Sequence, residues 1–250
     1  MTEHIRIDRE AGVQRLRLDR PEKKNAITNA MYETLTEALR TGEQDEAVRV
    51  HLLAGVPGAF TAGNDIEDFL SFAEEGALGE AVIHFLKTLA TVDKPMIAAV
   101  DGLAIGIGTT MLMHCDLVYA SPNSVFRTPF LDLGLVPEAA SSLLAPRLLG
   151  LPRAFELLCL GATFDAEQAH AAGLVNAVVR SDDVETQAFA AARELAAKPQ
   201  AALTAARRLL RGDPMDVIAR IEEEADLFRE RLRSEEARTA FHSFLSGKPG

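Results

Sequence analysis

The feature that most constrains the fold is a repeated pattern in which a short apolar run ends in a turn and leads into a helical stretch. Residues 48–54 and 95–100 are apolar runs typical of buried strands, and the glycine-containing turns 55–58 and 101–102 follow them. From residue 182 onward Ala, Glu, Arg and Leu dominate, and these residues favour helix. Strand–helix units followed by an all-helical tail predict an α/β fold with a helical appendage.

The remaining segments fit the same plan. Residues 13–18 alternate apolar and polar side chains, as a half-buried strand does, and apolar residues then recur at helical spacing after an N-cap at Thr28 or Asn29. Further strands are predicted at 117–120 and 125–127, and residues 172–179 are predicted as a turn followed by a last strand. Helices are predicted within 66–92, 106–114, 139–149, 153–159 and 166–171. The tail carries an apolar stripe that suits packing on the chain's own core or a contact between subunits, formed by Ile218, Ile221, Ala225, Phe228 and Leu232.

Charge and size limit the partners of this chain. Its 250 residues carry 26 Lys and Arg against 37 Asp and Glu, a net charge of −11, so non-specific binding to nucleic acid is not expected. The first ten residues lack the apolar core of a signal peptide, and the most apolar stretch, 103–113, is shorter than the roughly 20 residues of a membrane span. Cys115 and Cys159 are expected as reduced, buried thiols. We therefore expect a soluble cytoplasmic protein with no membrane partner.

Two glycine-containing turns follow predicted strands and precede predicted helices. The turn at 102–110 is not a nucleotide site, because Met111 stands where a dinucleotide fingerprint needs glycine and no lysine follows for a phosphate loop. It is either a packing turn or a helix start whose free N–H groups bind developing negative charge. The second turn, 60–66, contains Gly63, and Asp65 is placed to cap the following helix. Two such turns, each offering one N–H, are what an oxyanion hole requires.

A lone glutamate, Glu138, lies in the apolar stretch 133–143 with no basic residue nearby. Burial would raise its pKa and suit it to acid–base chemistry, whereas a place in the first helical turn after Pro137 would lower its pKa. The sequence leaves both outcomes open, and a glutamate that only stabilises a helix start is the plainer alternative. No Gly-x-Ser-x-Gly motif is present and the six histidines show no metal-binding spacing, so neither a serine hydrolase nor a metal site is predicted.

Several short motifs occur along the chain in a characteristic order. They are Arg20-Pro21 with Asn25-Ala26, residues 59–65, residues 94–102 continuing through 106–108, Cys115-Asp116-Leu117, residues 172–175, and Lys198-Pro199 with Ala202-Leu203. In this order and spacing they resemble the crotonase family, also called the enoyl-CoA hydratase/isomerase superfamily, over nearly the whole chain.

The resemblance implies a crotonase-like spiral of ββα units over residues 1–195 and a C-terminal helical trimerisation region over residues 196–250. It implies an acyl-CoA thioester substrate, a homo-oligomer that is a trimer or a dimer of trimers, and no metal or redox cofactor, with coenzyme A as part of the substrate. The backbone N–H groups of Asn64 and Ile107 would form the oxyanion hole and stabilise a thioester enolate.

Two departures from the family pattern narrow the reaction. Thr110 and Phe130 stand where the hydratases of the family have their two glutamates, and neither side chain can act as a general base. Glu138 falls where the Δ3,Δ2-enoyl-CoA isomerase branch has its single acid/base. The resemblance therefore implies an enoyl-CoA isomerase. The alternatives are a hydratase or another acyl-CoA enzyme of the same fold, and a non-catalytic acyl-CoA-binding protein.

The same resemblance implies which residues contact the acyl-CoA. Phe130 and Leu133 would help to exclude water from the site. Lys23 and Lys24 would lie near the coenzyme A phosphates, although plain solvated charge is the alternative for these lysines. The full set of expected contacts is Lys24, Ala26, Ala62, Gly63, Asp65, Ile66, Gly106, Phe130, Leu133 and, from a neighbouring subunit, Lys248.

Overall fold

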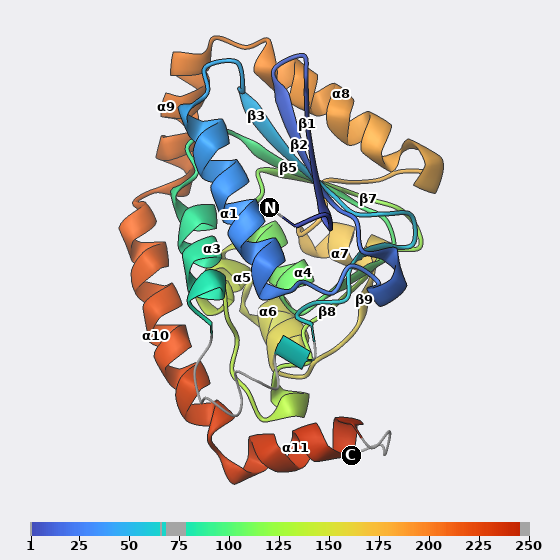
Figure 1. Ribbon diagram of the computed structural model, residues 1–250, viewed down its shortest axis with the longest axis vertical. Coiled ribbons are helices and arrows are strands. Elements are labelled where there is room, and N and C mark those ends of the chain that lie inside the picture. The colour runs from blue at the N-terminus through green and yellow to red at the C-terminus, as the bar shows by residue number, and fades with distance from the viewer. Residues whose placement is uncertain (1, 66, 69–78, 246–250) are drawn as a thin grey trace.

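The computed structural model describes residues 2–65, 67–68 and 79–245, and the strands of that part of the chain form two sheets (Figure 1). The larger sheet has the order β1 (Ile5–Glu10), β2 (Val13–Leu18), β3 (Val50–Ala54), β5 (Met96–Val100), β7 (Leu117–Ala120) and β10 (Ala177–Val178). The smaller sheet has the order β4 (Ala59–Thr61), β6 (Leu103–Ile105), β8 (Val125–Arg127) and β9 (Phe164–Asp165). Strands β1 and β2 form an antiparallel hairpin, and β2, β3, β5, β7 and β10 run parallel.

The chain alternates between the two sheets and so builds a spiral. Strand β3 leads into β4, β5 into β6 and β7 into β8, and each pair is followed by helix. Because β3, β5 and β7 are parallel neighbours in one sheet and β4, β6 and β8 are parallel neighbours in the other, each unit stacks on the one before. The expected spiral of ββα units followed by C-terminal helices is confirmed.

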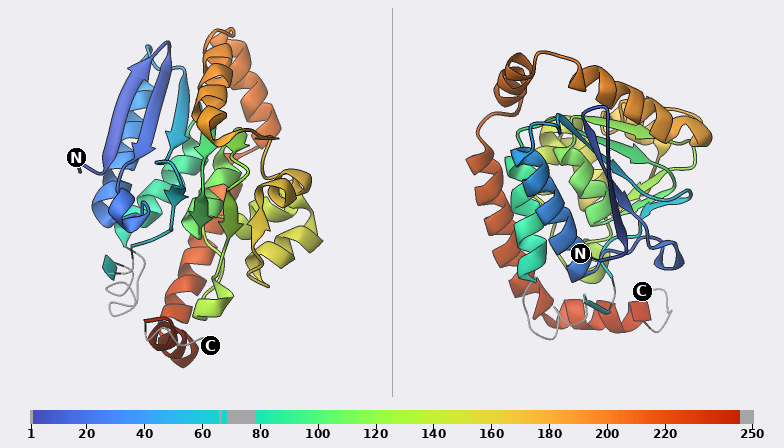
Figure 2. Two further views of the ribbon diagram at one scale, coloured as in Figure 1. Left: turned by 90° about the vertical axis from the view of Figure 1, so that its right-hand side faces the viewer. Right: turned by 45° about the horizontal axis from the view of Figure 1, so that its top comes forward.

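The helices surround this spiral. They are α1 (Asn29–Gln44), α3 (Glu80–Thr91), α4 (Ile107–Thr110), α5 (Ser141–Leu149), α6 (Leu151–Leu158), α7 (Ala166–Ala172), α8 (Val184–Ala196), α9 (Gln200–Arg211), α10 (Pro214–Leu232) and α11 (Glu235–Leu245). Short 3-10 turns occur at η1 (Pro21–Lys23), η2 (Met111–His114), η3 (Leu131–Leu133) and η4 (Ser181–Asp183). Helices α1 and α3 lie on one side of the larger sheet and α8 on the other, while α10 packs against α3 and α11 crosses the lower end of the molecule against η3 (Figure 1 and Figure 2).

The larger sheet is buried on both faces. Val50, Leu52 and Ile97 face α8, where they form a small core with the alanines of that helix. Leu53 and Ala98 point to the opposite face and join the main core under α1 and α3. Two-sided burial explains why the sequence shows unbroken apolar runs here rather than an alternating pattern. The strand predictions at 48–54 and 95–100 are thereby confirmed, with ends shifted by one or two residues.

Several other expectations hold. The strands at 117–120 and 125–127 have the predicted bounds, and the hydroxyl of Thr28 caps α1 by accepting a hydrogen bond from Met31 N at 3.4 Å. In the tail the predicted stripe packs on the chain's own core at four of its five positions, which are Ile221, Ala225, Phe228 and Leu232. The division of the chain at residue 195 stays a prediction.

Other expectations were wrong. The sequence analysis missed β1, whose charged residues lie on an exposed hairpin arm, and it missed β4, β6 and β9, which have only two or three residues each. The helix predicted from 139 begins at Ser141, because Ala139 and Ala140 adopt left-handed backbone angles. Residues 106–114 divide into α4 and the 3-10 turn η2. Cys115 and Cys159 are free, as expected, but half-buried rather than buried.

Within the part of the chain that the structure describes, no helix combines the length and the apolar character needed to cross a membrane.

A backbone contact between two glycines joins the turns that lead from one sheet to the other. Gly102 has a φ of +85°, and a Cβ atom at this position would lie 2.0 Å from the carbonyl oxygen of Gly58. Leu103 N donates a hydrogen bond of 3.4 Å to the same oxygen. The start of β6 is therefore held against the turn that precedes β4, and only glycine leaves room for this approach.

Substituting Gly102 should destabilise the protein more than substituting its neighbour. Gly58 has nearly the same φ, +84°, but a Cβ there would meet nothing within 4 Å. Gly58→Ala should therefore cost only the left-handed strain of roughly 1–2 kcal/mol. Gly102→Ala should cost about 1–3 kcal/mol more, because the backbone must also move apart. Urea unfolding of both variants checks the difference, and equal losses would contradict the contact.

Candidate functional site

The sequence-predicted site residues that the structure describes all line one cavity of about 1820 Å³. These residues are Lys24, Ala26, Ala62, Gly63, Asn64, Asp65, Gly106, Ile107, Phe130, Leu133 and Glu138. They come from four separate parts of the chain, and α11 adds a further wall through Thr239, Ala240 and Phe241. The two other expected contacts, Ile66 and Lys248, lie outside the described residues.

The buried side-chain amide of Asn25 fixes the loop that carries Lys23 and Lys24. Asn25 is fully buried, and its side chain donates to the carbonyl oxygens of Ala59 at 2.8 Å and Phe60 at 3.1 Å. The Asn25 Oδ1 atom accepts a hydrogen bond of 2.7 Å from Arg20 N. This clamp holds the loop against β4. Lys23 and Lys24 consequently stand, exposed, at the edge of the cavity.

Asp65 is a structural carboxylate on the cavity wall. Burial opposes its charge, but hydrogen bonds from the Arg20 guanidinium, at 2.5 Å, and from Glu67 N, at 3.0 Å, hold the pKa of Asp65 below its usual value. The helix that Asp65 was predicted to cap lies largely outside the described residues, so this cap stays a prediction. Asp65 therefore stays ionised and engaged by Arg20.

The two glycine turns lie side by side. A Cβ at Gly63 would lie 2.9 Å from the carbonyl oxygen of Ile105, and the backbone of Gly108 lies against Thr61. Gly63 has a φ of +95°, so this position favours glycine both for its backbone angle and for its close approach to the second turn. The parallel pairing of β4 with β6 thus brings the first turn against the second.

Each turn presents a backbone N–H that has no acceptor in the described part of the chain. Ile107 is the first residue of α4, where an N–H has no intrahelical partner. Gly63 O and Asp65 N both bond to Ile27, so the N–H of Asn64 between them faces the opposite side. Asn64 and Ile107 both line the cavity, and donors of this kind can stabilise negative charge that develops on a bound oxygen.

Glu138 is a buried carboxylate in the same cavity. Only 3% of the residue is exposed, and its Oε1 accepts a hydrogen bond of 2.9 Å from the Thr110 hydroxyl. Burial raises the pKa of Glu138 to about 8, the bond from Thr110 lowers the pKa in part, and the charge of Glu224 raises it further. A carboxyl whose pKa lies near neutrality can both take up and release a proton. The structure therefore decides between the two outcomes that the sequence left open.

Helix α5 does not lower the pKa of Glu138, because a different glutamate caps it. Glu224, on α10, accepts hydrogen bonds from Ala140 N at 2.6 Å and from Ser142 N at 2.9 Å. Glu138 lies three residues before the helix begins, so it is outside the first turn in which the dipole acts. The plainer alternative, a glutamate that stabilises the start of α5, fits Glu224 rather than Glu138.

Tyr32 contacts the glycine turn that contains Gly63 and Asn64. This tyrosine of α1 is buried, and its hydroxyl donates to Oδ1 of Asn64. Burial raises the pKa of Tyr32 well above its usual value, and the nearby charges of Glu138 and Asp68 add to the effect. The hydroxyl is consequently a neutral donor that fixes the Asn64 side chain.

Sequence reasoning missed the supporting roles of Tyr32, His114 and Glu224, and for Thr110 it recorded only the missing glutamate. Their partners lie 25 to 84 positions away along the chain, as in the bonds from His114 to Ala139 and from Ala140 to Glu224. Tyr32 and Glu224 also look like ordinary members of amphipathic helices. One signal was available in the sequence, because Glu224 lies next to the apolar stripe of α10. A glutamate at such a place is expected to be buried, and a buried glutamate needs a hydrogen-bond or charge partner.

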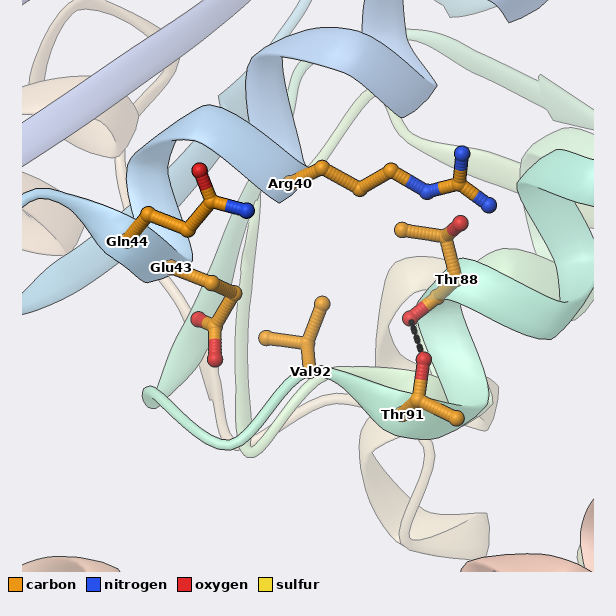
Figure 3. Close-up of a pocket in the computed structure, with 6 residues that line it drawn as sticks. All are labelled: Arg40, Glu43, Gln44, Thr88, Thr91 and Val92. Atoms are coloured by element: carbon orange, nitrogen blue, oxygen red, sulfur yellow. Dashed lines mark hydrogen bonds between the residues drawn. The ribbon is translucent and has the colours of Figure 1, made fainter.

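A smaller hollow of about 270 Å³ lies between the C-terminal ends of α1 and α3 (Figure 3). It is lined by Arg40, Glu43, Gln44, Thr88, Thr91 and Val92. Its carboxylate, Glu43, already binds His51 and accepts from the backbone N–H groups of Asp93 and Lys94. This hollow therefore offers no free acid/base.

No cluster of three or more His, Cys, Asp or Glu side chains among the described residues is arranged to hold a metal ion.

Comparison with known proteins gives consistent matches over the whole chain. The family model described as enoyl-CoA hydratase/isomerase matches residues 8–249. Enoyl-CoA delta isomerase 2 of Rattus norvegicus is 35% identical in an alignment 251 positions long. The alignment covers 98% of this chain but 64% of that protein, so the chain spans less than two thirds of its relative. The 1,2-epoxyphenylacetyl-CoA isomerase of Escherichia coli K12 is 34% identical over 98% of this chain and 97% of its own length. The structure of Pseudomonas aeruginosa OdaA is 45% identical, with a TM-score of 0.93 over 98% of this chain and 99% of that one.

The raised pKa of Glu138 makes a prediction about stability. Between pH 4.5, the usual value for a glutamate, and about pH 8, the folded protein holds a proton that the unfolded chain has released. The free energy of unfolding should therefore fall as pH rises through this range. Glu138→Gln, which stays neutral, should gain stability over the wild type by an amount that grows with pH, to on the order of 5 kcal/mol above pH 8.

Urea unfolding at pH 5, 7 and 9 measures this gain. Glu37→Gln, at an exposed position of α1, is the matched control and should show no such trend. A gain for Glu138→Gln that is constant with pH would contradict the raised pKa.

Proposed function

The chain belongs to the enoyl-CoA hydratase/isomerase family, and on that premise we propose that it converts a 3-enoyl-CoA into the 2-trans-enoyl-CoA. The observation that supports this proposal is Glu138, a buried carboxylate that shares its cavity with the backbone N–H groups of Asn64 and Ile107, which have no acceptor among the described residues. By the resemblance to the family, Thr110 and Phe130 occupy the places where its hydratases have their two glutamates. A double-bond shift needs one acid/base and no placed water.

The proposed reaction moves one proton within the substrate. Glu138 takes a proton from C2, and the electron pair moves onto the thioester oxygen to form an enolate. Hydrogen bonds from Asn64 N–H and Ile107 N–H stabilise this oxygen, and each such donor contributes on the order of 10²–10³ in rate. Glu138 then returns the proton to C4 as the enolate collapses. Protons and electrons balance within the substrate, so the reaction consumes no metal, redox cofactor or water.

The walls of the cavity suit this chemistry. Phe130 is buried and Leu133 half-buried, and both line the cavity, as does the buried Leu135. Apolar walls exclude water, which keeps the pKa of Glu138 high and protects the enolate from protonation by solvent. At the mouth, the exposed Lys23 and Lys24 would meet coenzyme A phosphates, and we keep Lys248 of a neighbouring subunit as an expected phosphate contact.

A second candidate function is isomerisation of a different acyl-CoA. The relative from Escherichia coli, which matches nearly end to end, is named a 1,2-epoxyphenylacetyl-CoA isomerase. A carboxylate that removes an α-proton beside two oxyanion donors also serves such a reaction. Hydration through a single carboxylate and non-catalytic binding of acyl-CoA are the remaining alternatives.

We also propose a homo-oligomer, a trimer or a dimer of trimers. Helix α9 is tied to its own chain by ion pairs, in which Arg207 and Arg211 bind Asp116. Its apolar side chains point outward instead, and Leu209 and Leu210 are 86% and 88% exposed. Large apolar residues this exposed are typical of a surface that a partner covers.

Glu138→Gln should separate binding from chemistry. The variant should bind acyl-CoA almost as the wild type does but lose at least about 10³-fold in turnover of 3-enoyl-CoA, because glutamine cannot carry the proton. Isomerisation is followed by the appearance of the conjugated 2-enoyl thioester, and binding by calorimetry with a saturated acyl-CoA. Undiminished turnover in the variant would contradict the proposed role of Glu138 as the acid/base.

Wild-type protein offered 2-enoyl-CoA is the companion experiment. Hydration of this substrate without isomerisation of 3-enoyl-CoA would favour the hydratase alternative, and binding without either reaction would favour the non-catalytic one.

Charging the outer face of α9 should break the oligomer. The wild type should show three or six times the mass of one chain in light scattering, and Leu210→Glu should reduce this mass because it buries a charge at the contact. Gln187→Glu, at an exposed polar position of α8, is the control for a surface charge change elsewhere. A monomeric wild type would refute the proposal.

A further inference from the structure

Glu138 projects from a backbone segment that is unusual for its sequence. The next two residues, Ala139 and Ala140, have φ angles of 62° and 54°, and two consecutive left-handed alanines are rare because their Cβ atoms crowd the backbone. Such a conformation persists only where the surrounding structure holds it. The direction of the Glu138 side chain therefore depends on whatever fixes these two residues.

Two buried side chains from distant parts of the chain hold this segment. Glu224, on α10, accepts from Ala140 N at 2.6 Å through one oxygen and from Ser142 N at 2.9 Å through the other. His114, in η2, donates from Nε2 to the carbonyl oxygen of Ala139 at 2.8 Å. Both side chains are almost completely buried, at 5% and 1% exposed. The bonds thus satisfy the polar groups of the left-handed turn on both sides.

We propose that Glu224 is a positioning residue, whose carboxylate locks the left-handed turn and the start of α5 and thereby aims Glu138 at Thr110 and the cavity. The lock is a property of the chain itself, and only its effect on turnover rests on the proposed isomerase function. A buried carboxylate that accepts two backbone N–H bonds at such distances contributes strongly to local order.

The charge of Glu224 adds a second effect, on proton transfer. The groups that face Glu138 are the Tyr32 hydroxyl from α1, the Thr110 hydroxyl from α4, and Glu224 with its neighbour Arg220 from α10. His114 faces the same turn from η2, but burial lowers its pKa to about 4, so it is neutral. Burial raises the pKa of Glu224 above its usual value, while the bonds from Ser142 N and Ala140 N and the charge of Arg220 oppose that rise. In its ionised form Glu224 adds to the rise in the pKa of Glu138, so its removal should lower that pKa.

Two variants separate the lock from the charge. Glu224→Gln removes the charge and replaces one acceptor oxygen by a donor, so kcat should fall about 10²-fold with KM changed less than about threefold, and Glu138 should titrate at lower pH. Glu224→Asp keeps the charge on a shorter side chain, so kcat should fall while the titration of Glu138 stays near its wild-type midpoint. Glu230→Gln, an exposed position on the same helix, is the control and should change neither quantity.

The titration of Glu138 is followed by carboxyl ¹³C NMR of the whole protein, with its signal assigned by its loss in Glu138→Gln. This readout does not depend on catalysis, so it tests the lock even if the wild type turns over no 3-enoyl-CoA. Faster hydrogen exchange at Ala140 N and Ser142 N in both Glu224 variants would support the lock. Unchanged exchange at these amides, with an unchanged Glu138 titration in Glu224→Gln, would overturn the proposal. If Glu224→Gln fails to fold, Glu224→Asp with wild-type exchange and wild-type kcat overturns it equally.

Discussion

Parallel pairing of β4 with β6 is the constraint on which the site depends. Each of these strands has three residues, so the smaller sheet could not persist without the larger one beside it. Pairing in the larger sheet fixes the distances between β3, β5 and β7. Strands β4, β6 and β8 each follow one of these strands directly, so they lie at similar distances from one another. Two turns that lie some forty residues apart in sequence are thereby stacked, with Gly63 against Ile105 and Gly108 against Thr61. The free N–H groups of Asn64 and Ile107 follow from this stacking rather than from any side chain.

Two buried carboxylates, Glu138 and Glu224, lie near each other but have different hydrogen-bond partners. Glu224 directs both of its oxygens to backbone N–H groups, whereas Glu138 receives a single hydroxyl and faces the open cavity. Donors that are fixed in place stabilise a charge, and burial without enough donors penalises it. Burial raises the pKa of both residues, and at Glu224 the two backbone donors and the charge of Arg220 oppose that rise more fully than the single Thr110 hydroxyl does at Glu138.

The sequence predicted most of the long strands and helices, because their periodicity and length are local properties. It also placed Glu138, Asn64 and Ile107 together, through motifs whose order resembles a known family. It could not predict the pKa of Glu138, which depends first on burial and then on Thr110 and Glu224, at separations that no local pattern encodes. For the same reason it extended α5 through Ala139 and Ala140, two residues with strong helix propensity that bonds from distant side chains force into the left-handed region.

The neutral state of His114 has a consequence for the type of side chain that position 114 can accept. The carbonyl of Ala139 needs a donor, and lysine or arginine could supply one, but each would bring a permanent positive charge into the same buried region. That charge would favour the ionised form of Glu138 and weaken its affinity for a proton. An imidazole whose pKa is about 4 donates without this penalty. Position 114 thus requires a side chain that donates a hydrogen bond and is uncharged at neutral pH. Being polar and of the right size is not sufficient.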